Sequence, residues 1–454
     1  MIALKVLTNV KRIMVFTMAI LSIIACKKTD SNWDDVKDPH DVGQNGHLRQ
    51  AKTFSSDVAI KWLNMELEMM RVPLAAGARS QGADRVLAYN GIALYHSILP
   101  GMPSYKTLSG QLIAFPAMPS AEPGKPYHWA ASANAAMAFI NRKLFPNASD
   151  ANKAAMDALE NSLQAIYASE VDDATLQRSI AFGREVANRV DVWSTTDGSA
   201  NVNPAYIPPV GPGLWVPTAP TPPVNPYASQ IRLLVPGVSA GTDPQPLPTY
   251  STNPASDFYK MVKDVYDKSL VLTDEQKAMA FYHRDAPGYP GGGHFVAVLS
   301  QVLTQSKATL DVAALACVKT GIGYHEAVTL CFTKKYQVNL VRPVTYIKDV
   351  MGFTSWATLI PTPNHPEFPS AHATNAGAVA VMLTSVFGHD FGFTLDTYQY
   401  LGFPARNYSS FADMAKEMSD SRVFGGIHYQ PSCDKGLIMG AKVGQNVLNK
   451  VKFR

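Results

Sequence analysis

The sequence lacks the long runs of one charge that nucleic-acid-binding chains carry. Its 454 residues include 40 Lys and Arg and 36 Asp and Glu, so 17% of the residues are charged. Removing Lys5, Lys11 and Arg12, which lie in a segment that we expect to be cleaved, leaves 37 basic residues against 36 acidic ones. This near-neutral balance gives no support for nucleic-acid binding. The 46% hydrophobic content predicts a globular protein with a large core.

Cysteine is also scarce, and its pattern excludes two kinds of site. Beyond Cys26 there are three cysteines, Cys317, Cys331 and Cys433. Three is an odd number, so internal disulfides would leave at least one thiol unpaired. No CxxC pair or Cys/His cluster has the spacing of a zinc site. We therefore interpret the three cysteines as small buried apolar residues.

The N-terminus has the layout of a secretory signal. Basic residues precede an apolar run from Ile13 to Ala25, which is too short for a comfortable membrane span. The run ends in Ile-Ile-Ala-Cys26, which resembles the lipobox of bacterial lipoproteins. We expect residues 1–25 to be a signal peptide, Cys26 to be lipidated and residues 26–53 to tether the protein to a membrane. This predicts a lipoprotein of the bacterial cell envelope, at the outer membrane. The alternative is an uncleaved anchor with a chance cysteine.

Strand patterns are rare in the rest of the chain, and helical patterns dominate. Apolar stripes at helical spacing predict an N-terminal helical region over 54–200 and a second helical region, the catalytic one, over 256–454. One predicted helix runs over 150–168 after Ser149, and another over 310–341. Residues 201–255 are dense in proline and predict a long irregular loop, which we interpret as a lid or mouth. The fold class is therefore all-α.

The first functional motif pairs Lys335 with Arg342. On one helix a spacing of seven residues places both cations on the same face, about two turns apart. Pro343 disfavours helix at the residue before it, so we expect Arg342 near the C-terminal end of that helix. Read alone, the pair is a solvated basic face.

The second motif is the helix start formed by Ser370, Ala371 and His372 after Pro369. Unpaired N–H groups and the positive end of the helix dipole favour an anion there. His372 can move protons near neutral pH. Read alone, Ser370 is an ordinary N-cap.

The third motif joins Arg422 to His428 across Gly425 and Gly426. On an unbroken helix the two side chains diverge, but a break at the glycines can turn both inward. Arg422 suits the edge of an oxyanion, and His428 can act as a ligand or nucleophile if another group orients its ring. Asp434 or a backbone carbonyl is a candidate for that orienting group.

Together the motifs supply three cations, which match a tetrahedral anion with two or three negative charges. The triple pattern resembles the superfamily of vanadium-dependent haloperoxidases and type 2 phosphatidic acid phosphatases. Segments beginning at Gly213, Ala278 and Gly293, and that following Arg342, resemble bacterial members of the haloperoxidase branch. The resemblance spans about residues 55–450, and it implies a helical bundle with the site inside it.

The resemblance implies roles for individual residues. Lys335, Arg342 and Arg422 would be the cations that bind the anion, with Ser370 and the N–H of Ala371 as further donors. His372 would be the acid/base residue, and His428 the vanadium ligand or the phosphorylated nucleophile. The family has Gly where this chain has Ala371, and its usual Asp lies four residues after the last His, whereas Asp434 lies six after His428. His365 matches the position of a His in bromide-oxidising members; its alternative is a surface loop histidine.

Three functions follow as hypotheses. The first is a haloperoxidase that uses vanadate, hydrogen peroxide and a halide such as bromide or iodide. The second is a phosphomonoesterase without vanadate, which cleaves a phosphate ester through a phosphohistidine at His428. The third is a non-catalytic lipoprotein that binds an oxyanion. The halide, the organic acceptor, the oligomeric state and the membrane face stay open.

Overall fold

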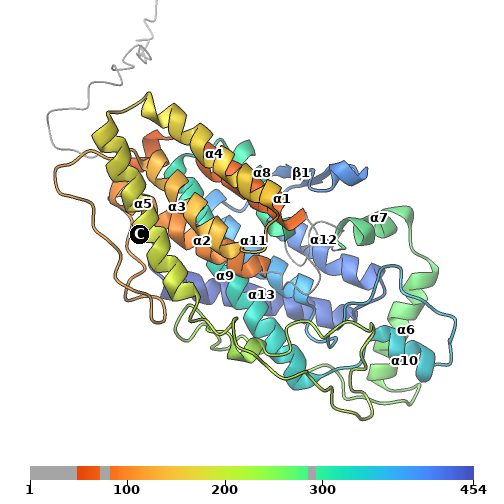
Figure 1. Cartoon of the computed structure of the whole chain (residues 1–454). Coiled ribbons are helices and arrows are strands. Elements are labelled where there is room, and N and C mark those ends of the chain that lie inside the picture. Colours follow the sequence, from red (N-terminus) through yellow and green to blue (C-terminus); the bar gives the residue numbers. More distant parts are fainter. Residues whose placement is uncertain (1–48, 72–81, 285–292) are drawn as a thin grey trace, which may run out of the picture. The chain divides into compact units, whose positions relative to one another are not determined.

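The computed structural model describes residues 49–71, 82–284 and 293–454 (Figure 1). The signal peptide, Cys26 and most of the tether lie outside the described residues. The helices are α1 Asp57–Arg71, α2 Ala83–Ile98, α3 Trp129–Leu144, α4 Asp150–Ala168, α5 Asp173–Ser194, α6 Asp257–Leu270, α7 Asp274–Tyr282, α8 Gly293–Gln305, α9 Leu310–Val338, α10 Pro343–Asp349, α11 Ala371–Phe387, α12 Phe411–Phe424 and α13 Gln430–Lys450. The described strands are β1 Phe393–Leu395 and β2 Arg406–Tyr408, which pair antiparallel.

The all-α prediction is confirmed, and side-chain caps explain several helix starts. The oxygen of Ser149 accepts a hydrogen bond from the N–H of Asn152, so α4 begins where the sequence predicted. Thr273 and Gln276 form a reciprocal capping box at α7. In the described part of the chain, no helix is both long and apolar enough to span a membrane.

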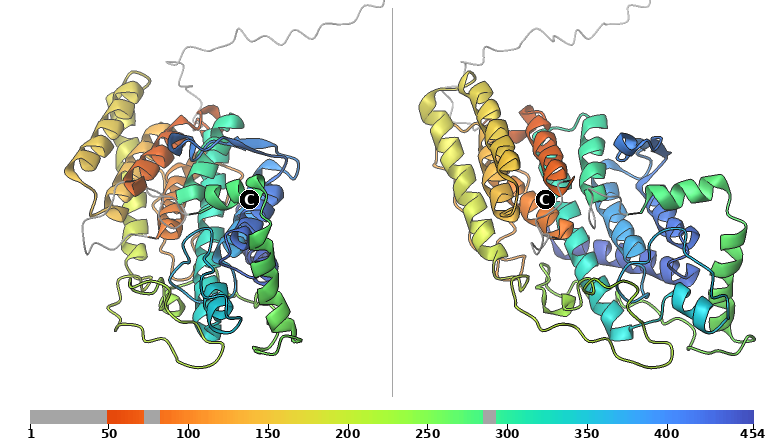
Figure 2. Two further views of the ribbon diagram at one scale, coloured as in Figure 1. Left: turned by 90° about the vertical axis from the view of Figure 1, so that its right-hand side faces the viewer. Right: turned by 45° about the vertical axis from the view of Figure 1, so that its right-hand side comes forward.

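The long helix α9 lies between the N-terminal and the C-terminal helices. It packs against α2 on one side and α11 on the other, and α11 in turn packs against α12 and α13 (Figure 2). Residues 49–454 therefore share one compact unit, and the boundary at 255/256 stays a prediction.

Glycine permits the close approach of α11 and α13. A Cβ on Gly440 would lie 1.8 Å from the carbonyl oxygen of Thr374, and one on Gly377 would lie 2.5 Å from that of Leu437. Real Cβ atoms do not come this close, so larger residues would push the helices apart. The contact fixes the start of α11 beside the start of α13, where two of the predicted motifs lie.

The placement of Arg342 corrects the sequence prediction. The helix α9 ends at Val338 rather than 341, because Asn339 adopts the left-handed conformation with φ 50°. The chain then reverses, and Arg342 is the N-cap residue of α10. Lys335 and Arg342 therefore do not share a helix face, and tertiary structure rather than helical spacing brings them together.

The proline-rich segment is irregular as predicted, apart from a short 3₁₀ turn at Ala228–Gln230. The N–H of Trp215 donates to the carbonyl oxygen of Asn339 at 2.7 Å, and the N–H of Thr218 donates to Oδ1 of Asn364 at 3.1 Å. The segment thus contacts the chain just before Arg342 and just before His365. Its role as a lid or mouth stays a prediction.

Candidate functional site

Arg342 is fully buried and joins segments from two of the three motifs. Its Nη1 donates to the carbonyl oxygen of Ile427 at 2.8 Å and to Nε2 of His428 at 3.1 Å. Its Nε donates to the carbonyl oxygen of His365 at 2.9 Å, and its Nη2 lies 2.9 Å from Nδ1 of the same residue. The guanidinium of Arg342 therefore holds the rings of His365 and His428 on either side of itself, so that both border the same small region.

Lys335 lies in the last turn of α9 and has no exposed surface. Its Nζ donates to the carbonyl oxygens of Pro366 and Glu367, both at 2.9 Å. Burial, assisted by the nearby charge of Arg342, lowers the pKa of Lys335 to about 7. The ammonium thus borders the segment that carries His365, and its charge is costly unless an anion approaches.

Ser370 is the N-cap residue of α11, but its side chain makes no capping hydrogen bond. Its Oγ is buried and has no partner among the described residues. Ala371 follows in the first turn of the helix and is not among the residues with positive φ, so its N–H can serve where the family has Gly. The helix start therefore offers an unused hydroxyl for a bound anion.

His372 is half-buried, unlike the rest of the cluster. Its charge is among the causes that lower the pKa of His365 and of His283, which lies at the end of α7. It therefore lies on the side of the cluster that faces α7, which suits a residue that exchanges protons with a substrate.

Arg422 lies in the last turn of α12 and is 2% exposed. Its Nη1 donates to the carbonyl oxygen of His283 at 2.6 Å. After it α12 ends at Phe424, and Gly426 adopts φ +76°, which turns the chain so that His428 points back toward Arg342. The predicted glycine break is therefore present.

A carboxylate that the sequence analysis missed orients His428. Oε1 of Glu367 lies 2.7 Å from Nδ1 of His428 and accepts from the N–H of Tyr429 at 3.0 Å. Asp434 instead accepts a hydrogen bond from Gln430 on its own helix. The orienting group is thus Glu367, which no spacing rule from His428 could find. The one available signal was an acidic residue between Pro366 and Pro369, in the segment that carries His365 and Ser370.

These contacts assign the tautomer of His428. A carboxylate at Nδ1 keeps the proton there, so Nε2 presents its lone pair and accepts from Arg342. Burial lowers the pKa of His428, and the charges of Arg342, Lys335 and Arg422 lower it further. The ring is therefore neutral, as a metal ligand or nucleophile must be.

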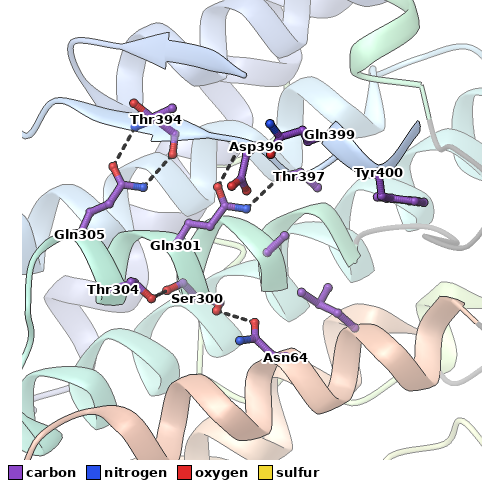
Figure 3. A pocket seen from close by; sticks show the side chains of 12 residues that line it. Asn64, Ser300, Gln301, Thr304, Gln305, Thr394, Asp396, Thr397, Gln399 and Tyr400 are labelled. Atoms are coloured by element: carbon purple, nitrogen blue, oxygen red, sulfur yellow. Dashed lines mark hydrogen bonds between the residues drawn. The ribbon is translucent and has the colours of Figure 1, made fainter. Parts of the chain in front are cut away.

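A pocket of about 540 Å³ elsewhere has a different character (Figure 3). Two glutamine side chains in its lining are hydrogen-bonded to the chain around β1. The side-chain oxygen of Gln305 accepts from the N–H of Thr394, and that of Gln301 accepts from the N–H of Asp396. The lining has no Lys, Arg or His, so it lacks the groups for the anion chemistry that the motifs predict.

The comparisons with known proteins point to one superfamily. Residues 316–454 match the family model for the VCPO second helical-bundle domain. The first bacterial vanadium-dependent iodoperoxidase of known structure is 27% identical, with a TM-score of 0.77 over 88% of this chain and 97% of its own. The holo and apo forms of a bacterial vanadium-dependent chloroperoxidase, at 16% and 17% identity, share the fold with TM-scores of 0.63 and 0.62 over 87% of this chain and 98% of theirs. No curated protein matches the sequence.

The fold of this chain, and the sequence of residues 316–454, match those of vanadium haloperoxidases.

The segment that matches the family model holds every predicted site residue from Lys335 to His428. His365 is 6% exposed and lies between Arg342 and the ring of Phe332, so the alternative of a surface loop histidine is wrong. Burial, together with Lys335 and Arg342, lowers its pKa. Nδ1 of His365 lies 2.9 Å from Nη2 of Arg342 and 3.1 Å from the carbonyl oxygen of Pro366. Arg342 can only donate and is the nearer partner, so Nδ1 accepts from it and the proton of the neutral ring is at Nε2.

The three cysteines of the haloperoxidase-like chain are buried and unpaired, as predicted. Cys331 and Cys433 lie close enough to the site for their charge states to affect the pKa of Lys335. Burial raises the pKa of Cys433 to about 12, so its thiol stays protonated. These residues serve as packing around the cluster.

Proposed function

We propose that this protein is a vanadate-dependent haloperoxidase that oxidises bromide or iodide with hydrogen peroxide. The observation that carries the proposal is the fully buried cluster of Lys335, Arg342 and Arg422 around the neutral ring of His428. Among the described residues, the carboxylate in contact with this cluster is Glu367, which leaves an excess of positive charge. A buried charge excess of this kind is relieved by an anion.

The residues fit vanadate. His428 would ligate through Nε2, the three cations would neutralise the oxygens, and the hydroxyl of Ser370 would donate to one of them. Bound vanadate supplies a Lewis acid that activates peroxide without changing oxidation state. A ligand at Nε2 would take the place of the hydrogen bond from Arg342, whose Nη1 could then donate to the anion.

The protein's own residues supply orientation and protons. Glu367 keeps the proton of His428 at Nδ1, so the ligand atom does not need to deprotonate. His372, on the half-buried side, would receive a proton from hydrogen peroxide and return it to the leaving oxygen. The overall reaction consumes one halide ion, one hydrogen peroxide and one proton, and it yields hypohalous acid and water.

His365 is our candidate for the halide position. The Nε2–H group of His365 is a hydrogen-bond donor on a ring that contacts the ring of Phe332, and the positive charges of Lys335 and Arg342 are close enough to act on it. A neutral donor near two cations suits a large, weakly hydrated anion. We expect a His365→Ala variant to lose halide oxidation through a higher KM for halide, with vanadate binding retained.

The test is an activity assay on a form that begins at Lys27. Loaded with vanadate, it should oxidise iodide or bromide with peroxide, and a His428→Ala variant should not. The phosphomonoesterase alternative uses the same cluster, with His428 attacking phosphorus and His372 protonating the leaving oxygen. Hydrolysis of a phosphate ester that vanadate blocks, without halide oxidation, would replace our proposal by that one. Neither activity from a folded protein would favour the non-catalytic oxyanion binder.

We further propose a lipid-anchored envelope location, supported by the sequence around Cys26 alone. The full chain should incorporate labelled fatty acid and fractionate with outer membranes, whereas a Cys26→Ser variant should do neither. Recovery of unlabelled wild-type protein in the soluble fraction would refute this location.

A further inference from the structure

A second cationic pocket lies far from the site. It has a volume of about 390 Å³ and forms between the first half of α9 and the ends of α11 and α13, beside the C-terminal residue marked in Figure 1. Lys319, in its wall, precedes Lys335 by sixteen residues on α9, which corresponds to about 24 Å of helix. The two cationic groups therefore belong to separate sites on the same helix.

Lys319 is a buried cation without a counter-charge. Its side chain belongs to a residue that is 9% exposed, and its Nζ donates to Oγ of Ser385 at 3.0 Å. Among the described residues, no carboxylate lies within the 4.0 Å of an ion pair. By contrast, the more exposed Lys334 lies 3.0 Å from Asp243. The ring of Phe453 also lies beside the ammonium, with its centroid 5.5 Å from Nζ. A buried ammonium can make three hydrogen bonds, and Ser385 takes one, so Lys319 retains capacity for an acceptor.

Two further cations line the same pocket. Lys452 donates to the carbonyl oxygen of Asn449 at 2.8 Å, and the guanidinium of Arg454 lies over the ring of Tyr105 at 4.5 Å. Asp311 is the nearby acid: it accepts from Thr309 at 2.5 Å and from Tyr105 at 3.5 Å. It does not pair with Lys319. Even when the α-carboxylate of Arg454 is counted against Lys319, Lys452 and the guanidinium of Arg454, the lining keeps a positive excess.

Most of the other residues that line the pocket are apolar. They contribute aliphatic side chains and one aromatic ring, from Val312, Leu315, Val386, Leu448, Val451 and Phe453. Inorganic phosphate would leave these side chains in contact with water. An anion with a hydrocarbon part satisfies both halves of the pocket, because its head can accept from Lys319 while its chain covers the apolar side chains.

We propose that this pocket binds an amphiphilic carboxylate, with its head on Lys319 and its hydrocarbon part against Leu448 and Phe453. A single buried ammonium matches a monoanion, and the volume is in the range of small-molecule sites. The binding needs neither vanadate nor peroxide, so it stands or fails independently of the haloperoxidase reaction.

The test is calorimetric titration of the full chain, without vanadate, with sodium decanoate. Lys319→Met keeps the length and apolar character of the side chain and removes its charge. We expect it to weaken decanoate binding by at least roughly tenfold, which is the scale of one lost charge-assisted hydrogen bond. Lys442→Met, on the exposed surface of α13, is the matched control and should leave the affinity unchanged within about twofold.

Two further measurements separate the alternatives, even if Lys319→Met does not fold. Decanol and inorganic phosphate should each bind wild-type protein at least about tenfold more weakly than decanoate, since each satisfies one half of the pocket. Leu448→Asp places a negative charge at a half-buried position among the apolar side chains and should also weaken decanoate binding. Equal binding of phosphate, equal binding of decanol, or decanoate affinity that survives both variants would each overturn the proposal.

Discussion

Removing the buried charge of Lys335 should stabilise the anion-free protein while damaging anion binding. Burial lowers the pKa of Lys335 from 10.5 to about 7, which corresponds to about 5 kcal/mol against the charged form. Lys335→Met removes this cost. It also leaves the carbonyl oxygens of Pro366 and Glu367 without their donor, at about 1 kcal/mol each. The expected net gain is about 2–3 kcal/mol in the free energy of unfolding near pH 7.

The direction of the pKa shift of Lys335 determines how the stability of the variant depends on pH. A base whose folded pKa is lowered destabilises the protein fully below that pKa, and the cost disappears as pH rises toward the unfolded value. The net advantage of Lys335→Met should therefore be largest below pH 7 and reach zero near pH 9, where the remaining charge cost of about 2 kcal/mol equals that of the two lost hydrogen bonds. At pH 9.5 the variant should be slightly less stable than wild type. Urea denaturation of vanadate-free protein at pH 6.5 and 9.5, followed by tryptophan fluorescence, measures both values.

The same substitution should weaken anion binding. At an effective dielectric constant of 20, one charge next to the anion contributes up to about 4 kcal/mol, so a loss of about 3 kcal/mol, or about 100-fold in affinity, is reasonable. Vanadate titration of both proteins at pH 6.5 measures this loss of affinity. Lys334→Met is the matched control, because the neighbouring Lys334 pairs with Asp243 away from the cluster. A Lys335→Met protein that is less stable than wild type at pH 6.5, or that binds vanadate equally well, would refute the reasoning.

Three other perturbations test separate parts of the site. Glu367→Ala should leave His428 without a fixed tautomer and reduce halide oxidation by about 10–100-fold. Nitrogen NMR of the His428 ring would reveal the change of tautomer. The control is Glu326→Gln, at a buried carboxyl group that accepts from the N–H groups of Leu234 and Val235; it should leave the activity and the NMR signal unaltered. Asp434→Asn should bind vanadate as wild type does, since Asp434 contacts Gln430; a tenfold loss would return the orienting role to Asp434. Burial raises the pKa of Glu417, but hydrogen bonds from His283, Arg406 and Tyr408 outweigh it and lower the pKa to about 2. Glu417→Gln should therefore cost about 2–3 kcal/mol of unfolding free energy above pH 4.5, a difference that fades as pH falls toward 2 and that thermal melts across this range would detect.

Local patterns predicted the two helical regions and the bounds of α4, but not the way the site assembles. Ser149 and the apolar spacing after it located α4 at its observed bounds, because capping and periodicity act within a few residues. Arg342 was assigned to the wrong helix, since the left-handed turn at Asn339 and its contact with Trp215 depend on a segment more than a hundred residues earlier. The role of Glu367 rests on a contact with a residue 61 positions away. Such pairs follow from tertiary packing, which a single sequence does not display.

The family pattern located the cations and histidines, and it implied their roles. The structure adds how they are held: Arg342 bridges His365 and His428, and the carbonyl of His283 anchors Arg422. The group of His283, Glu417 and Arg406 therefore supports the anion cluster from outside: Arg406 forms an ion pair with Glu417, and the neutral ring of His283 is hydrogen-bonded to the same carboxylate. Its residues lie at the end of α7, in α12 and in β2, and no sequence motif links them.

A crystal structure of the protein soaked with vanadate tests the central claim most directly. The account predicts density for one tetrahedral or five-coordinate vanadium species attached to Nε2 of His428, with Lys335, Arg342 and Arg422 around its oxygens. Vanadate found elsewhere, or none at a concentration that supports halide oxidation, would contradict it.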